Sequence, residues 1–137
     1  MGSRIACHFA NTGLQVLLLD IAPGELMPEE TAAGLSLDHP AVRNRIVNTS
    51  LQNALKSSPS PVYDRKVASR ITTGNFSDDL KSLRDCDWII EAVVENLDIK
   101  RALFSKVEEH RKPGTLITSN TSGIPIRLMA EGRSDDF

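Results

Sequence analysis

Short apolar runs alternate with helical patterns along this chain, and the alternation limits it to a few folds. The two clearest runs are residues 14–19 and 88–94, which are apolar at nearly every position. A short run that is apolar on both faces is typical of a strand buried in a parallel sheet. Strands that alternate with helices build such a sheet with helices on both of its faces. We therefore predict an α/β fold.

The other expected elements complete this alternation. A helix is expected to begin near residue 2 and to end at 11–13, where Asn-Thr-Gly provides a stop signal. The remaining predictions are a helix over 41–57, a strand over 71–73 closed by Gly74, a short helix over 78–84, a helix over 97–110, a strand over 115–119 and a helix from about 125. The stretch 28–66 is a helical insert between two strands.

Composition restricts the class of protein. The chain has 137 residues, 40% of them apolar and 25% charged, with a net charge of −2. This length predicts one domain, and the charge gives no reason to expect a nucleic-acid or membrane partner. Cys7 and Cys86 lie far apart, without the spacing of metal ligands, which favours reduced thiols in a cytoplasmic protein. We expect no signal peptide and no metal site.

Asp20 is the first candidate binding residue, because it ends the 14–19 run. A carboxylate at the end of the second strand of a dinucleotide-binding unit accepts hydrogen bonds from the adenosine ribose. Its charge also disfavours the 2′-phosphate of NADP. The alternative is an aspartate that opens the turn before Pro23 and Gly24. Gly2 fits the third glycine of a G-x-G-x-x-G loop, a weak signal on its own.

Four segments in order resemble 3-hydroxyacyl-CoA dehydrogenases. Residues 1–6 resemble the end of the family's nucleotide loop, and 17–20 resemble its second strand. The run Ile-Glu-Ala-Val-Val-Glu-Asn at 90–96, followed by Lys100, is similar to its fourth strand and the next helix. Ser-Asn-Thr-Ser at 119–122 is similar to the loop of its catalytic serine. The resemblance covers essentially the whole chain.

The resemblance implies a Rossmann-type doubly wound parallel sheet with a helical insert after the second strand, the chain being an incomplete NAD-binding domain over 1–137. The family's first strand and first two glycines would precede Met1, and its catalytic His–Glu dyad would follow Phe137. The fragment alone would then be inactive. In the 3-2-1-4-5-6 strand order, the 15–20 and 88–94 strands would lie two spacings apart, roughly 10 Å. We expect no direct pairing between these two strands. Either another segment fills the gap between them, or the isolated fragment is unstable.

The implied reaction is the NAD-dependent oxidation of a 3-hydroxyacyl-CoA to a 3-oxoacyl-CoA in fatty-acid β-oxidation. By resemblance, the Ser122 hydroxyl would hydrogen-bond the substrate oxygen at C3. Met1 and Gly2 would border the cofactor's phosphates, and Glu95 and Lys100 would lie beside its nicotinamide ribose. For Lys100 the alternative is a solvated helix lysine, and for Glu95 an acid favoured at a helix N-terminus. Dimers are usual in the family.

The insert is the candidate coenzyme A contact. Residues 41–70 contain six basic residues and one acidic residue. In the family this region touches coenzyme A, and Ser50 matches a serine that contacts it. A lysine contact of the family falls at Ser57 here, with Lys56 adjacent, and this departure leaves that contact in doubt. A basic face around Arg43 and Arg45 could hold the phosphates, or it could be an ordinary solvated face.

Two other functions remain open at this stage. The chain could be a dinucleotide-binding module or pseudoenzyme that keeps Asp20 without catalysis. It could also be a short-chain 3-hydroxyacid dehydrogenase, although such enzymes have neither the Ser-Asn-Thr-Ser loop nor the long basic insert.

Overall fold

The computed structural model describes all residues from Met1 to Phe137 and divides into two compact units, Met1–Asp79 and Leu80–Phe137. Each unit is built around one pair of parallel strands. None of the helices is both long and apolar enough to cross a membrane.

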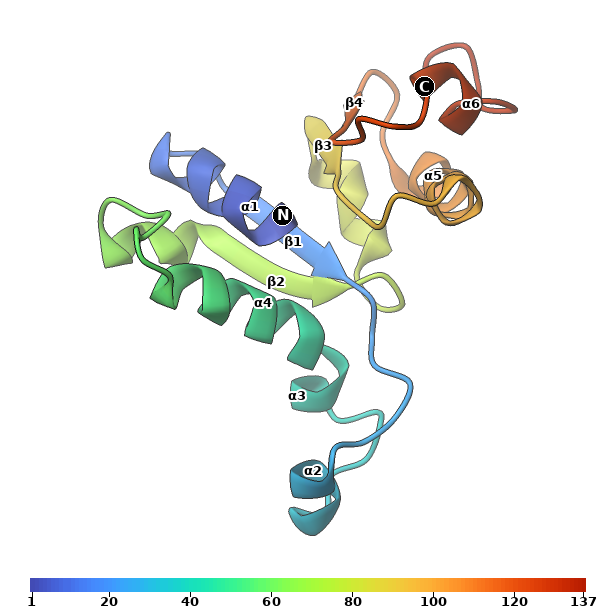
Figure 1. Cartoon of the computed structure of the whole chain (residues 1–137). Helices are drawn as coiled ribbons and strands as arrows, with labels where there is room; N and C mark the ends of the chain where they lie inside the picture. The colour runs from blue at the N-terminus through green and yellow to red at the C-terminus, as the bar shows by residue number, and fades with distance from the viewer. The chain divides into compact units, whose positions relative to one another are not determined.

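The first unit is a βαβ arrangement with an additional N-terminal helix. Strands β1 and β2 pair in parallel, in a register that runs from Val16 opposite Ile71 to Asp20 opposite Asn75. Figure 1 shows the two strands side by side. The elements in chain order are α1 (Gly2–Asn11), β1 (Val16–Asp20), α2 (Pro28–Ala32), α3 (Pro40–Arg43), α4 (Arg45–Lys56), the 3-10 helix η1 (Arg65–Arg70) and β2 (Ile71–Asn75).

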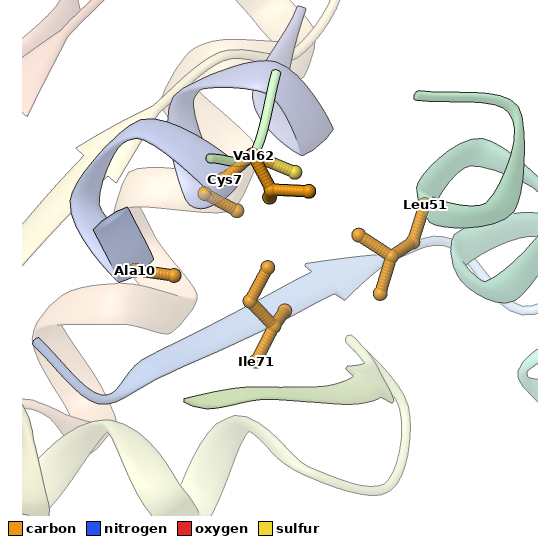
Figure 2. Close-up of a cluster of buried hydrophobic side chains, with 6 residues drawn as sticks. Cys7, Ala10, Leu51, Val62 and Ile71 are labelled. Carbon is orange, nitrogen blue, oxygen red and sulfur yellow. The ribbon is translucent and has the colours of Figure 1, made fainter. Parts of the chain in front are cut away.

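One apolar cluster holds the first unit together. Helices α1 and α4 contact each other and both strands, and their inward side chains meet in the core drawn in Figure 2. The buried members are Ala6, Cys7, Ala10, Leu51, Val62 and Ile71, with Val16, Leu18, Leu55 and Val67 packed against them. Val16 and Leu18 are two positions apart on β1, so they lie on the same face of the strand. The α1 residues recur at helical spacing, as the sequence predicted.

The predicted continuous helix over 41–57 is wrong, because a break at Asn44 separates α3 from α4. The Asn44 backbone lies outside the helical region, with φ −102° and ψ 10°. The Asn44 side-chain oxygen accepts a hydrogen bond of 2.9 Å from the side-chain amide of Asn75, at the end of β2. This tertiary contact places the bend, which explains why the apolar periodicity alone could not predict it.

The second unit has a similar strand, helix, strand order. Strands β3 and β4 pair in parallel, from Trp88 opposite Leu116 to Glu91 opposite Ser119. The elements are the 3-10 helix η2 (Leu80–Asp85), β3 (Trp88–Glu91), α5 (Leu97–His110), β4 (Leu116–Ser119) and α6 (Ile126–Met129). The short helix predicted over 78–84 is therefore a 3-10 helix. The predicted 88–94 strand ends at Glu91, whose carboxylate accepts a hydrogen bond of 2.6 Å from the Val93 amide.

The strand pairs agree with the order inferred from the resemblance. In the order 3-2-1-4-5-6, the pair β1 and β2 corresponds to neighbours 2 and 3, and β3 and β4 correspond to neighbours 4 and 5. Strands β1 and β3 do not pair with each other, and each keeps one edge without a strand partner. Every residue of β1 is partly exposed rather than buried as predicted, which follows from pairing on a single edge.

We predict that Leu51→Ala destabilises the first unit by about 2–5 kcal/mol, because it removes a core side chain and leaves a cavity. Leu51 is 8% exposed within the cluster. Leu37→Ala is the matched control, since Leu37 is 40% exposed and its truncation should change little. The test is hydrogen exchange of the α1 and α4 amides against urea concentration in the full-length protein. Equal effects of the two substitutions would contradict this view of the core.

Candidate functional site

Asp20 lies at the carboxyl end of β1, where the resemblance expects the acid that binds ribose. Its main chain is fixed, because its carbonyl accepts a hydrogen bond of 2.9 Å from the Phe76 amide. Its Oδ1 accepts a bond of 2.8 Å from the Ile21 amide just beyond the strand. The side chain is partly exposed. This geometry leaves Asp20 at the edge of a parallel sheet where ligands of such folds bind.

The beginning of α1 provides a group of backbone donors. The helix begins at Gly2, and no side chain caps its N-terminus at Met1. The first amides of a helix have no partner within the helix, and the helix dipole favours an anion beside them. This arrangement fits a phosphate group of a dinucleotide.

An open pocket of about 320 Å³ joins this helix end to the insert. Its lining includes Met1 and Arg4 from the start of the chain and Ser50 from α4. The structure therefore brings Ser50 close to the N-terminus of α1. Lys56, the other predicted coenzyme A residue, is the last residue of α4 and is exposed.

Ser57, at the position of the family's lysine, contacts the first helix. Its hydroxyl accepts a hydrogen bond of 2.9 Å from Arg4 and donates one of 2.7 Å to the Ala54 carbonyl. The residue thus joins α4 to α1 without supplying a positive charge.

Arg43 and Arg45 of the insert are engaged in ion pairs. Arg43 contacts Asp78 through Nε at 2.5 Å and through a terminal nitrogen at 2.8 Å. Hydrogen bonding to Asp78 raises the Arg43 pKa above its ordinary value. Arg45 pairs with Glu30 at 2.7 Å. The acids lie outside residues 41–70, so the count of charges within that window overstated the available positive charge, and the structure favours the solvated-face alternative for these two residues.

The second unit contains a buried ion pair. The Lys100 ammonium donates to the two carboxylate oxygens of Glu91 at 2.8 and 2.9 Å. Both side chains are 1% exposed. Lys100 also donates to the Val93 carbonyl at 3.3 Å. The interpretation of Lys100 as a solvated helix lysine is therefore wrong.

Glu95 holds the loop that follows β4. Its Oε1 accepts hydrogen bonds from the Thr121 hydroxyl, from the Gly123 amide at 2.8 Å and from the Ser122 amide at 3.3 Å. Its Oε2 lies 3.6 Å from the Lys100 ammonium. The Thr121 hydroxyl, then the backbone amides and the Lys100 charge, hold the Glu95 pKa below its ordinary value. The carboxylate therefore remains ionised, and remains an acceptor, at neutral pH.

The register of β3 and β4 explains why these residues meet. Glu91 lies opposite Ser119, so the segments leaving the two strands begin side by side. Glu95, Lys100 and Ser122 are thereby brought into one region of the second unit, and Ser122 is exposed there. An exposed hydroxyl on a loop fixed by a carboxylate can donate a hydrogen bond to a bound carbonyl or hydroxyl oxygen.

Sequence reasoning missed Glu91 as a member of this region. The available signal was an acid within the apolar 88–94 run, at a position predicted to be buried. A buried carboxylate requires a partner. Lys100, nine positions later, was the nearest following base, but the turn that brings the two together was not evident from the spacing.

We predict that Lys100→Met destabilises the second unit by about 3–5 kcal/mol, because it leaves Glu91 buried and unpaired. Lys112→Met is the control. Lys112 pairs with Asp87 at 2.6 Å, but the two side chains are 44% and 92% exposed, and an exposed pair contributes little. Hydrogen exchange of residues 97–110 against urea concentration measures both effects. A Lys100→Met protein as stable as Lys112→Met would contradict the prediction.

The chain is similar to several known proteins. The model of the family described as "3-hydroxyacyl-CoA dehydrogenase, NAD binding domain" matches residues 1–136. A "Probable 3-hydroxyacyl-CoA dehydrogenase" of Bacillus subtilis is 52% identical over all 137 residues, which are 17% of that protein. Another protein of that name, from Deinococcus radiodurans, is 42% identical over the same 137 residues, 36% of its length. The chain thus spans well under half of these relatives.

Solved structures are also similar. A 3-hydroxybutyryl-CoA dehydrogenase of Escherichia coli aligns with a TM-score of 0.60 at 30% identity, covering 96% of this chain and 25% of that one. M. tuberculosis FadB2 aligns with a TM-score of 0.60 at 32% identity, covering 95% of this chain and 40% of that one. These likenesses confirm the predicted Rossmann-type fold. The chain belongs to the family of NAD-binding domains of 3-hydroxyacyl-CoA dehydrogenases.

Proposed function

We propose that the full-length protein oxidises a 3-hydroxyacyl-CoA to a 3-oxoacyl-CoA with NAD, as a step of fatty-acid β-oxidation. The observation that carries the proposal is the Ser122 loop, which follows β4 and is fixed by Glu95 in a chain that matches the family along its length. Family membership identifies NAD as the cofactor, and the serine loop supports the proposed reaction.

Asp20 and the start of α1 are the proposed contacts of the adenosine half of NAD. The Asp20 carboxylate would accept hydrogen bonds from the ribose hydroxyls and would repel a 2′-phosphate. Met1 and Gly2 would place the first amides of α1 beside the pyrophosphate. The position of Gly2 at the start of α1 and the partial exposure of Asp20 support this assignment.

Ser122 is the proposed catalytic residue of this chain, and Glu95 and Lys100 are proposed to lie on the nicotinamide ribose side. The Ser122 hydroxyl would donate a hydrogen bond to the substrate oxygen at C3, which stabilises the charge that develops there. NAD, when bound, would supply the acceptor for the hydride that leaves C3. The resemblance assigns the proton transfer to a His–Glu dyad that follows these segments in the family.

Ser50 and Lys56 are the proposed coenzyme A contacts. Ser50 lines the pocket beside α1, and Lys56 is an exposed cation on the same helix. The ion pairs of Arg43 and Arg45 argue against a wider basic face. The proposal includes a homodimeric, cytoplasmic enzyme that acts on a small-molecule thioester rather than on a nucleic acid or a membrane.

We predict that the full-length protein forms NADH from a 3-hydroxyacyl-CoA and that Ser122→Ala lowers kcat about 10²–10³-fold, the usual cost of losing one donor to a developing oxyanion. The KM for NAD should change little. NADH absorbance measures the rate, with Ser36→Ala as the control, since Ser36 is exposed in the insert. No NADH formation by an intact protein that binds NAD would instead support a non-catalytic dinucleotide-binding module.

A further inference from the structure

Glu91 has no role in the proposed reaction, yet its carboxylate is buried in the second unit. Its side chain is 1% exposed and accepts from the Lys100 ammonium at 2.8 and 2.9 Å. It also accepts from the Val93 amide at 2.6 Å. Lys100 and the Val93 amide therefore fix the carboxylate independently of the serine loop.

Glu91 also holds the beginning of the loop that carries Ser122. The Ser119 hydroxyl donates a hydrogen bond to Glu91 Oε2 and accepts one of 3.1 Å from the Thr121 amide. The Asn120 amide donates to the Glu91 main-chain carbonyl at 2.7 Å. Glu91 thus bonds positions 119 and 120 directly, and the Ser119 hydroxyl extends this contact to position 121, next to the proposed catalytic serine.

Lys100 connects this anchor to a second one. Its ammonium lies between Glu91 and Glu95 Oε2, which is 3.6 Å away. Glu95 in turn accepts from the Thr121 hydroxyl and from the Ser122 and Gly123 amides. The loop is therefore held at its beginning by Glu91 and at its tip by Glu95, with one buried cation beside both carboxylates.

We propose that Glu91 and Ser119 are positioning residues that set the location of the Ser122 hydroxyl. This inference rests on the proposed function. Glu91, ion-paired to Lys100, fixes Ser119, and the Ser119 hydroxyl fixes the turn at Thr121. Neither residue contacts the substrate.

The buried pair of Glu91 and Lys100 benefits the protein more by positioning the loop than by adding stability. A buried ion pair gains little stability over apolar residues of similar volume, because desolvation of the two charges offsets their attraction. It does impose a definite geometry on the groups bonded to it. A displacement of about 1 Å of a catalytic group can lower a rate by about 10²-fold, so a fixed geometry at residues 119–122 would benefit catalysis directly.

Ser119→Ala in the full-length protein is the decisive variant, because it removes the side-chain connection from Glu91 to Thr121 and keeps the ion pair. We expect kcat to fall about tenfold, a part of the cost of a full 1 Å displacement, while the KM for NAD stays within about twofold. Hydrogen exchange of the Thr121 and Ser122 backbone amides, measured without substrate, should become faster than in the wild type. Ser119→Thr retains the hydroxyl and should restore both properties.

Glu91→Gln should lower kcat at least as much, and Glu108→Gln is its matched control. Glu108 lies on the same helix as Lys100, pairs with Arg133 at 2.9 Å and accepts from the Ser134 amide at 2.7 Å, away from the serine loop. Glu108→Gln should leave kcat and the exchange of residues 121–122 unchanged. If Glu91→Gln does not fold, Ser119→Ala alone decides.

Two results would overturn the inference. One is wild-type loop exchange in Ser119→Ala, which would show that the hydroxyl does not hold the turn. The other is faster exchange with an unchanged kcat, which would show that the position of the turn does not affect catalysis. A wild-type protein without dehydrogenase activity would overturn the proposed function as well, and the exchange measurement would then report on the loop contact alone.

Discussion

Parallel pairing of two strands in each unit decides which residues become neighbours at the strand ends. Parallel strands end at the same edge, so the residues that leave them are neighbours although they are distant in sequence. In the first unit this places Asp20 opposite Asn75, and in the second it places Glu91 opposite Ser119. The second register creates the contact between the buried ion pair and the serine loop. A slip of β4 by one residue would turn the Ser119 side chain to the other face of the sheet, away from Glu91.

Much of the fold could be predicted because the signals are local. The apolar runs specify β1 and β3, and helical spacing specifies α1 and α5. The break at Asn44 could not be predicted, because it depends on a hydrogen bond to Asn75, 31 positions away. The pairing of Arg43 with Asp78, 35 positions away, was hidden for the same reason. The prediction that another segment occupies the open edges of β1 and β3 stays untested.

The candidate site also has features that could be predicted from the sequence and others that could not. Asp20, Glu95 and Ser122 could be located because each follows a predicted strand, and ligands bind at strand ends in α/β sheets. Their roles came from the resemblance. The environment of Lys100 could not be predicted, since its burial depends on the turn from 92 to 96 that returns the chain over Glu91. Sequence spacing thus identified candidate groups, while the hydrogen bonds that orient them required three-dimensional structure.

We propose that Asp20, at the end of β1, binds the adenosine ribose of NAD. Calorimetric titration of the full-length protein with NAD and with NADP, for the wild type and for Asp20→Ala, tests it directly. We expect the wild type to bind NAD more tightly than NADP and Asp20→Ala to lose most of this preference, because the carboxylate that repels the 2′-phosphate is gone. An unchanged preference for NAD in Asp20→Ala would contradict it.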